Sequence, residues 1–188
     1  MKCGKPVREE QVYCERCEGK ERWFTQGRSI LLYNDVLKAS MIKYKYEGRR
    51  EYGDFYAKLM CHFGKKEIFR WNPDIILPVP LHNHKLRARG FNQAEYLAVY
   101  IGREFGIPVE NDILKKVKNT RSQKKLNAAE RKENLKNAFS VCEDVSGLNI
   151  LIVDDVYTTG GTMEEIASLL CAKNAKKVFF LTICTGYN

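Results

Sequence analysis

The sequence predicts an α/β fold in which a mostly parallel central sheet is flanked by helices. Apolar runs of strand length alternate along the chain with segments of helical periodicity, a pattern typical of parallel sheets. One apolar run leads into two aspartates, a Thr- and Gly-rich turn and a new helix, as strands of α/β folds do at their binding edge. The chain has 188 residues, 44% of them hydrophobic, which is enough for one medium domain with a real core.

The first predicted elements are one short strand and two helices. Residues 30–33 form an apolar run of strand length. Asn34 is a good helix cap, and the helix after it runs to Tyr46 and ends at Gly48. Apolar residues at helical spacing then mark an amphipathic helix. They are Tyr52, Phe55, Tyr56, Leu59, Met60 and Phe63.

The middle of the chain predicts a strand, a basic turn and a helix. Residues 74–80, DIILPVP, have the pattern of a buried strand that ends in prolines. The basic segment HNHKLRARGFNQ, residues 82–93, is expected to form a turn. Apolar residues at helical spacing from Ala94 to Phe105 predict a helix, which Gly106 closes.

The last part of the chain predicts a basic arm followed by a strand, a helix and a strand. Residues 115–136 carry nine Lys or Arg against two Glu, as in a long loop or a detached arm. Residues 148–153 form a β-rich run, and residues 178–184 form a final apolar strand. The helix between them has one buried face. That face consists of Met163, Ile166, Ala167, Leu169 and Leu170.

The cysteines fall into two groups. Cys3, Cys14 and Cys17 lie in residues 1–24, a polar stretch without periodicity, which we expect to form a small segment apart from a main domain at 25–188. The other four are scattered through apolar or helical patterns and are expected to be ordinary, partly buried thiols. They are Cys61, Cys142, Cys171 and Cys184.

Composition limits the class of protein. No run approaches the roughly 18 apolar residues of a membrane span. The N-terminus lacks the apolar core of a secretory signal, so we expect a cytoplasmic protein without a disulfide framework. The net charge of +9 favours polyanionic partners such as phosphates, pyrophosphate or nucleic acid, and solubility alone is the alternative explanation.

Residues 150–162, ILIVDDVYTTGGT, are the most informative stretch. Adjacent ionised carboxylates repel each other, so Asp154 and Asp155 suit a site where ribose hydroxyls or Mg²⁺ join them. The turn after them offers backbone amides, glycines and threonine hydroxyls at the start of a helix, which suits a phosphate. It is not a Walker loop, because GxxxxGK[ST] is absent. The alternative is an acidic strand end followed by a capped helix.

The segment VDDVYTTGGT resembles the phosphoribosyl-pyrophosphate motif of the type I phosphoribosyltransferases. Three further segments resemble the ComF family, and the resemblance covers almost the whole chain. They are IKYKYEGRREYGDFYAKLM, LPVPLHNHKLRARGFNQAEYLA and RSQKKLNAAERKENLKNAF. The most specific part of the resemblance is the element Arg-Gly-Phe-Asn-Gln at residues 89–93.

The resemblance implies a type I phosphoribosyltransferase fold and a role for each part of the site. Asp154 and Asp155 would hold the ribose hydroxyls, directly or through Mg²⁺. Arg87 and Arg89 would bind pyrophosphate, since a guanidinium pairs bidentately with phosphate oxygens. The 5-phosphate would lie in the turn formed by Thr158, Thr159, Gly160, Gly161 and Thr162.

The resemblance also implies a mobile loop at residues 118–136 that closes over pyrophosphate, with Arg121 and Lys124 reaching in. The reaction it implies is displacement at C1 of the ribose while Mg-pyrophosphate leaves. Mg²⁺ and basic side chains would stabilise the departing charge. The sequence shows neither a general base nor a pocket for the acceptor.

ComF proteins commonly begin with a zinc knuckle of four cysteines, which implies Zn²⁺ at Cys3, Cys14 and Cys17. The fourth cysteine of that pattern would lie before Met1. Three thiolates leave tetrahedral zinc one ligand short, and a water, His62 or a nearby chain would complete it. The alternative is a degenerate segment without metal. The three histidines, His62, His82 and His84, show no metal spacing and are expected to be polar groups.

Three functions follow from these observations. The first is binding of phosphoribosyl pyrophosphate or a related nucleotide with Mg²⁺, with possible transfer of phosphoribose, linked to competence and DNA uptake. The second is a non-catalytic competence factor that keeps the fold and binds single-stranded DNA or a competence helicase. The third is a regulator that senses phosphoribosyl pyrophosphate. The oligomeric state and the acceptor stay open.

Overall fold

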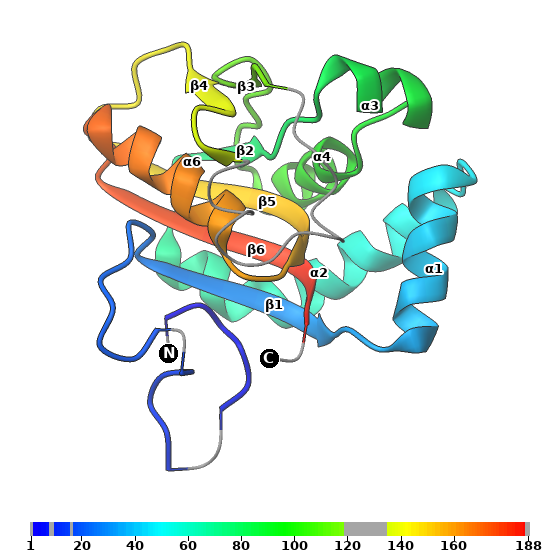
Figure 1. Ribbon diagram of the computed structural model, residues 1–188, viewed down its shortest axis with the longest axis horizontal. Helices are drawn as coiled ribbons and strands as arrows, with labels where there is room; N and C mark the ends of the chain where they lie inside the picture. Colours follow the sequence, from blue (N-terminus) through cyan, green and yellow to red (C-terminus); the bar gives the residue numbers. More distant parts are fainter. Residues whose placement is uncertain (1, 8–9, 16, 119–134, 187–188) are drawn as a thin grey trace.

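The computed structural model describes residues 2–7, 10–15, 17–118 and 135–186, and its centre is a four-stranded parallel sheet (Figure 1). The strands lie in the order β1, β6, β5, β2, and every neighbouring pair is parallel. Their bounds are Gln26–Leu32 for β1, Ile75–Pro78 for β2, Asn149–Tyr157 for β5 and Lys177–Thr185 for β6. The predicted parallel sheet is therefore confirmed.

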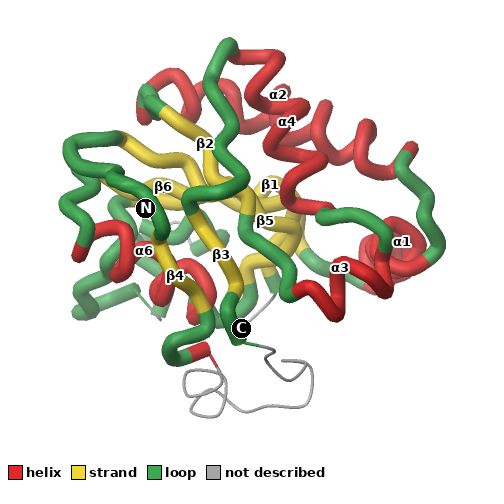
Figure 2. Tube along the Cα trace, turned by 90° about the horizontal axis from the view of Figure 1, so that it is seen from above, coloured by secondary structure: helices red, strands yellow, loops and turns green. Residues whose placement is uncertain are grey.

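Helices cover both faces of the sheet, as Figure 2 shows from above. One face packs against α1 (Asp35–Tyr46), α2 (Glu51–Trp71) and α4 (Gln93–Phe105). The other packs against α6 (Gly161–Ala172) and the antiparallel pair β3 (Leu114–Lys116) and β4 (Phe139–Val141). Alternate residues of β5 enter the two apolar clusters, because successive strand side chains point to opposite faces.

Three elements differ from the prediction around the site. One is β3, which includes residues 115 and 116 although these were expected to belong to the basic arm. The segment 82–93, expected to be a turn, contains a short helix, α3 (Asn83–Arg89), which His82 caps and Gly90 ends with a φ of 78°. Strand β5 does not stop at Val153 but runs through both aspartates to Tyr157, because β6 continues to pair with it as far as Thr185.

The N-terminal segment lies against the edge of the sheet. The amide of Gly27 on β1 donates a hydrogen bond of 2.7 Å to the carbonyl of Lys2. Cys3, Cys14 and Cys17 are buried in the same apolar cluster as the α6 face of the sheet. The domain boundary expected at residue 24 stays a prediction. Within the described ranges, no helix has the length and apolar character needed to span a membrane.

Candidate functional site

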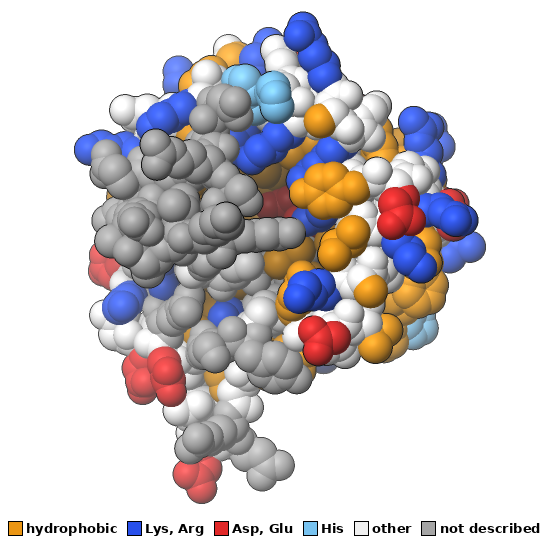
Figure 3. All heavy atoms as spheres, turned by 45° about the vertical axis from the view of Figure 1, so that its right-hand side comes forward, with side chains coloured by type: hydrophobic (Ala, Val, Ile, Leu, Met, Phe, Trp, Pro, Cys, Tyr) orange, Lys and Arg blue, Asp and Glu red, His pale blue; other side chains and the backbone are white. Residues whose placement is uncertain are grey.

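The two aspartates lie near the end of β5, on the floor of a cavity of about 410 Å³. The backbone amide of Asp155 donates to Oδ1 of Asp154 at 2.8 Å, which fixes the first carboxylate relative to the strand. Elements α1, α3, β3 and the β5–α6 loop line the same cavity. Figure 3 shows acidic side-chain atoms deep in a hollow with Lys and Arg side chains beside it. The site therefore combines a carboxylate floor with a basic rim.

Five basic side chains line this cavity together with the aspartates, and they come from three elements, α1, α3 and β3. Lys45 of α1 places Nζ 2.6 Å from Oδ2 of Asp155. Sequence reasoning predicted Arg89 but missed the four lysines, although Lys45 lies in a segment that carries the ComF resemblance. The five residues are Lys38, Lys45, Lys85, Arg89 and Lys116.

The charges in the cavity perturb one another. Burial and the neighbouring Asp155 raise the pKa of Asp154 to about 7. Burial, with Lys85 and Arg89 close by, lowers the pKa of Lys116 to about 8. Burial alone would lower the pKa of Lys45, but its ion pair with Asp155 outweighs burial and the net direction is upward. Such clustered shifts are typical of a site prepared for a charged ligand.

The loop between β5 and α6 forms the side of the cavity expected to bind phosphate. Gly160 has a φ of 87° and starts a helix of 12 residues, so the positive end of the helix dipole faces this loop. A Cβ on Gly160 would lie 2.6 Å from the hydroxyl of Tyr157. Glycine is therefore required for two reasons, the left-handed φ and the lack of space for a side chain. Thr158, Gly160, Gly161 and Thr162 line the cavity, whereas Thr159 is half-buried beside it.

Three predicted basic residues are not brought to the cavity by the described structure. Arg87 is exposed on α3 and lies outside the lining. Arg121 and Lys124, with most of the expected loop, lie outside the described residues. Among the histidines, His82 accepts a hydrogen bond from the backbone amide of His84 as the cap of α3, and His62 packs its ring against Phe63.

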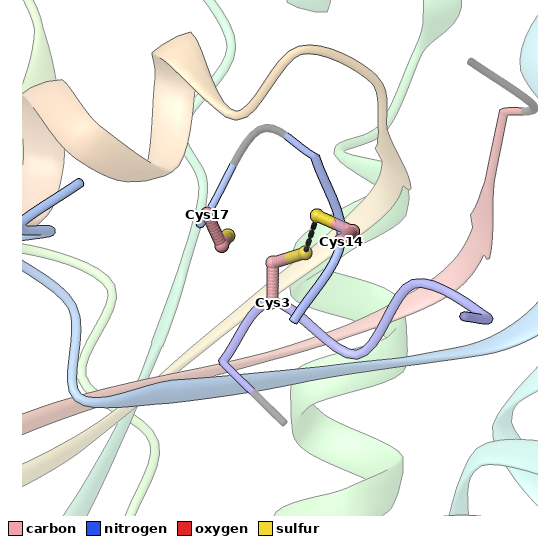
Figure 4. Close-up of side chains that lie close together, drawn as sticks. All are labelled: Cys3, Cys14 and Cys17. Atoms are coloured by element: carbon pink, nitrogen blue, oxygen red, sulfur yellow. Dashed lines mark hydrogen bonds between the residues drawn. The ribbon is translucent and has the colours of Figure 1, made fainter. Parts of the chain in front are cut away.

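The N-terminal cysteines form a second candidate site. The Sγ atoms of Cys3, Cys14 and Cys17 all lie within 4.8 Å of one another, and Figure 4 shows the three side chains converging. The Sγ atoms of Cys3 and Cys14 are 3.4 Å apart. Burial raises the pKa of Cys3 to about 12. Three convergent sulfur ligands fit Zn²⁺, with the fourth tetrahedral position left for another group. His62 is not part of this group among the described residues.

Comparison with known proteins places the chain in a family. The model of the phosphoribosyl transferase domain matches residues 89–187, more than half of the chain. Competence protein F of Haemophilus influenzae is 32% identical over 175 residues, covering 89% of this chain and 76% of that protein. This chain belongs to the ComF family of the type I phosphoribosyltransferases.

Other ComF-family relatives and a solved structure are similar over much of their length. The DNA utilization protein YhgH of Salmonella typhimurium is 33% identical over 97% of this chain and 82% of that protein. Competence protein ComFC of Bacillus subtilis is 29% identical over 181 residues, which cover 91% of this chain and 70% of that protein. The crystal structure of the purine phosphoribosyltransferase of Pyrococcus horikoshii is 18% identical in sequence and has a TM-score of 0.44. The match covers 70% of this chain and 71% of that chain.

The ComF element Arg-Gly-Phe-Asn-Gln holds Arg89 at the cavity. Arg89 donates to Oε1 of Gln93 at 2.9 Å and to the hydroxyl of Tyr46 at 3.3 Å, and its guanidinium lies 5.1 Å from the centre of the Tyr46 ring. Asn92 caps α4 by accepting from the amide of Ala94. The side chain of Gln93 is almost fully buried. The element therefore explains how a flexible arginine is positioned before any ligand binds.

Proposed function

We propose that the chain binds phosphoribosyl pyrophosphate, or a nucleotide with the same phosphoribose, together with Mg²⁺. The observation that supports this most is that paired carboxylates, a glycine-containing loop at a helix N-terminus and five basic side chains line one cavity. Each of the three chemical parts of this ligand has a matching part of the cavity. Family membership points to the same ligand class.

The roles follow from charge and hydrogen-bonding capacity. The amides and hydroxyls of the loop 158–162 bind the 5-phosphate. Asp154 and Asp155 accept hydrogen bonds from the ribose hydroxyls, and their oxygens are ligands of the kind that Mg²⁺ prefers. Lys85, Arg89 and Lys116 surround the pyrophosphate. Mg²⁺, when bound, supplies neutralising charge to the departing pyrophosphate.

In the transfer step, the bond from C1 of the ribose to pyrophosphate breaks and a bond from C1 to the acceptor forms. Pyrophosphate leaves with the electron pair, and the acceptor's proton passes to solvent. The basic side chains are already in place, so they stabilise the developing negative charge without rearrangement.

Calorimetry with Mg-phosphoribosyl pyrophosphate tests the binding proposal. The unaltered chain is expected to bind, and the double variant Asp154→Asn with Asp155→Asn is expected to lose measurable binding. Asp112→Asn is the matched control, because Asp112 is exposed and lies outside the cavity lining. Absence of binding to the unaltered chain would overturn the proposal.

The names of the relatives favour a second candidate function. Proteins named for DNA utilization and for competence are similar over most of this chain, which carries a net charge of +9. On this proposal the chain binds single-stranded DNA or a competence helicase and keeps the fold without catalysis. Titration with single-stranded DNA at about 50 mM and about 200 mM salt should show affinity that falls steeply with salt.

Release of pyrophosphate distinguishes the two candidates. A screen of bases and amines as acceptors, with phosphoribosyl pyrophosphate as donor, is expected to reveal turnover if the chain is a transferase. Binding of DNA without any release would favour the non-catalytic factor, and release without DNA binding at low salt would exclude direct contact with DNA.

We also propose that Cys3, Cys14 and Cys17 bind one Zn²⁺ in a structural role. The sulfur ligands bind as thiolates, so zinc uptake is expected to release protons. Elemental analysis of purified protein should give about one zinc per chain. Cys14→Ser should abolish zinc uptake, whereas the control Cys142→Ser, which alters an exposed thiol, should retain it.

A further inference from the structure

Tyr157 lies between the cysteine cluster and the loop proposed to bind phosphate. It is the last residue of β5, it is buried, and its ring stacks on Phe180 with a centroid distance of 4.7 Å. Its side chain lies near that of Cys3, in the same buried cluster. Its hydroxyl lies 2.6 Å from the point where Gly160 would carry a Cβ. One rigid phenol therefore lies beside both a candidate metal ligand and the backbone of the loop.

A second connection joins the N-terminal segment to the start of α6. Arg22 forms an ion pair of 3.1 Å with Glu164, which lies in the first turn of that helix. The other carboxylate oxygen of Glu164 accepts from the backbone amide of Trp23 at 3.1 Å. The segment that carries the cysteines is thus fixed to the helix whose N-terminus faces the ligand cavity.

We infer that metal binding at the cysteines and phosphate binding at the loop are coupled, with Tyr157 as the positioning residue that links them. This inference rests on the proposed function of the cavity. Metal bound to Cys3 fixes its thiolate and with it the Tyr157 hydroxyl, which packs against Gly160 and holds the loop in its binding shape. Without metal, part of the ligand's binding energy is spent on ordering the loop.

Thermodynamic linkage makes the inference testable from both sides. Removal of zinc should weaken the binding of Mg-phosphoribosyl pyrophosphate by about fivefold or more, and the ligand should strengthen zinc binding by the same factor. Calorimetry on the zinc-loaded and the stripped chain gives the first number. Competition with a chromophoric chelator, with and without the ligand, gives the second and does not depend on catalysis.

Two variants test whether Tyr157 transmits the coupling between the cysteine cluster and the loop. Tyr157→Phe keeps the ring that stacks on Phe180 but removes the hydroxyl, so it should reduce both coupling factors toward unity. Cys142→Ser alters an exposed thiol outside the cluster and should leave both factors unchanged. Far-ultraviolet circular dichroism of the stripped chain should show that its helices persist.

Each other outcome overturns the inference in a recognisable way. Equal ligand affinities of the loaded and stripped chain overturn the coupling but leave the proposed function intact. Absence of binding in both forms overturns the two together. Undiminished coupling in Tyr157→Phe removes Tyr157 as the link. A chain that takes up no zinc, or that loses its helical signal when stripped, also overturns the inference.

Discussion

Asp154 lies beside a second carboxylate and has little access to solvent. Both conditions destabilise its ionised form in the folded state. Its pKa is raised to about 7 by burial and by Asp155. The folded state then holds this proton more tightly than the unfolded state, so the contribution of Asp154 to stability is fully present below about pH 4 and is lost as the pH rises to about 7. A ligand or cation that binds both carboxylates would reduce the repulsion between Asp154 and Asp155.

Asp154→Asn should therefore stabilise the chain at high pH. The amide keeps the acceptor for the backbone N–H of Asp155 and removes the charge. Relative to the unaltered chain, we expect a gain of about 1–3 kcal/mol in the free energy of unfolding at about pH 8 and almost none at about pH 4. Urea unfolding at both pH values measures this. A gain that does not change with pH would contradict the explanation.

Lys45 is the counter-ion of this carboxylate pair. Its side chain and that of Asp155 are only 20% and 14% exposed, so Lys45→Met leaves a partly buried carboxylate without its partner. We expect a loss of about 1–3 kcal/mol in the free energy of unfolding at neutral pH. Lys43→Met on the exposed side of α1 is the control and should change it by less than about 0.5 kcal/mol. Similar losses in both variants would rule out this role for Lys45.

Single residues of the site were predictable where one segment carried the chemistry. Asp154, Asp155 and the loop glycines share one continuous motif, and their placement at the cavity was expected. Lys85 and Lys116 come from separate elements. Their convergence depends on packing, which the pattern of one segment does not encode. Arg87 was expected beside Arg89, but two residues apart on a helix is the wrong spacing for a shared face.

Among the elements, the errors in prediction arose where periodicity was weak. None of the residues of α3 is buried, so it gives no apolar pattern, and its ends are set by His82 and Gly90. Strands β3 and β4 have three residues each, too few for a periodic signal. The apolar run of β5 ends at Val153, yet pairing with β6 extends the strand to Tyr157. The long helices α1 and α4, with clear caps and apolar faces, were predicted well.

The β5–α6 loop depends on glycine at position 160. Gly160→Ala must strain a left-handed φ and also displace the Tyr157 hydroxyl, whereas the control Gly147→Ala strains a φ of 74° with open space around it. We expect Gly147→Ala to cost about 1 kcal/mol of stability and Gly160→Ala clearly more. Gly160→Ala should also weaken ligand binding about tenfold or more. Thermal unfolding and calorimetry measure the two effects, and equal costs would exclude the contact with Tyr157.

Helix α3 presents its two arginines to different surroundings, and this predicts unequal roles. Arg89→Ala should weaken the binding of Mg-pyrophosphate by about tenfold, because it removes a charged donor already held at the cavity. Arg87→Ala on the exposed side should change the affinity by less than about twofold. Calorimetry with inorganic pyrophosphate compares them. A larger effect from Arg87 would reverse the assignment.

At the scale of the whole molecule, the sheet collects the carboxyl ends of parallel strands at one edge, and the site lies there. Alternation of strands and helices along the sequence made this architecture predictable. The order of the strands was not predictable, because the packing of the connecting helices determines which strands become neighbours. The N-terminal segment, which has no periodicity, gave no sign that its cysteines would be buried in the apolar cluster on the α6 face of the sheet.

The position of β6 between β1 and β5 has a consequence for synthesis on the ribosome. The last described strand in sequence, β6, pairs with both β5 and β1. Strand β5 directly precedes it among the strands of the sheet, but β1 is synthesised some 150 residues before its partner. Contacts this distant in sequence predict slow, all-or-none folding. Nascent chains arrested before residue 177 should be cut readily by protease, whereas chains that extend past residue 185 by the length of the exit tunnel should resist it.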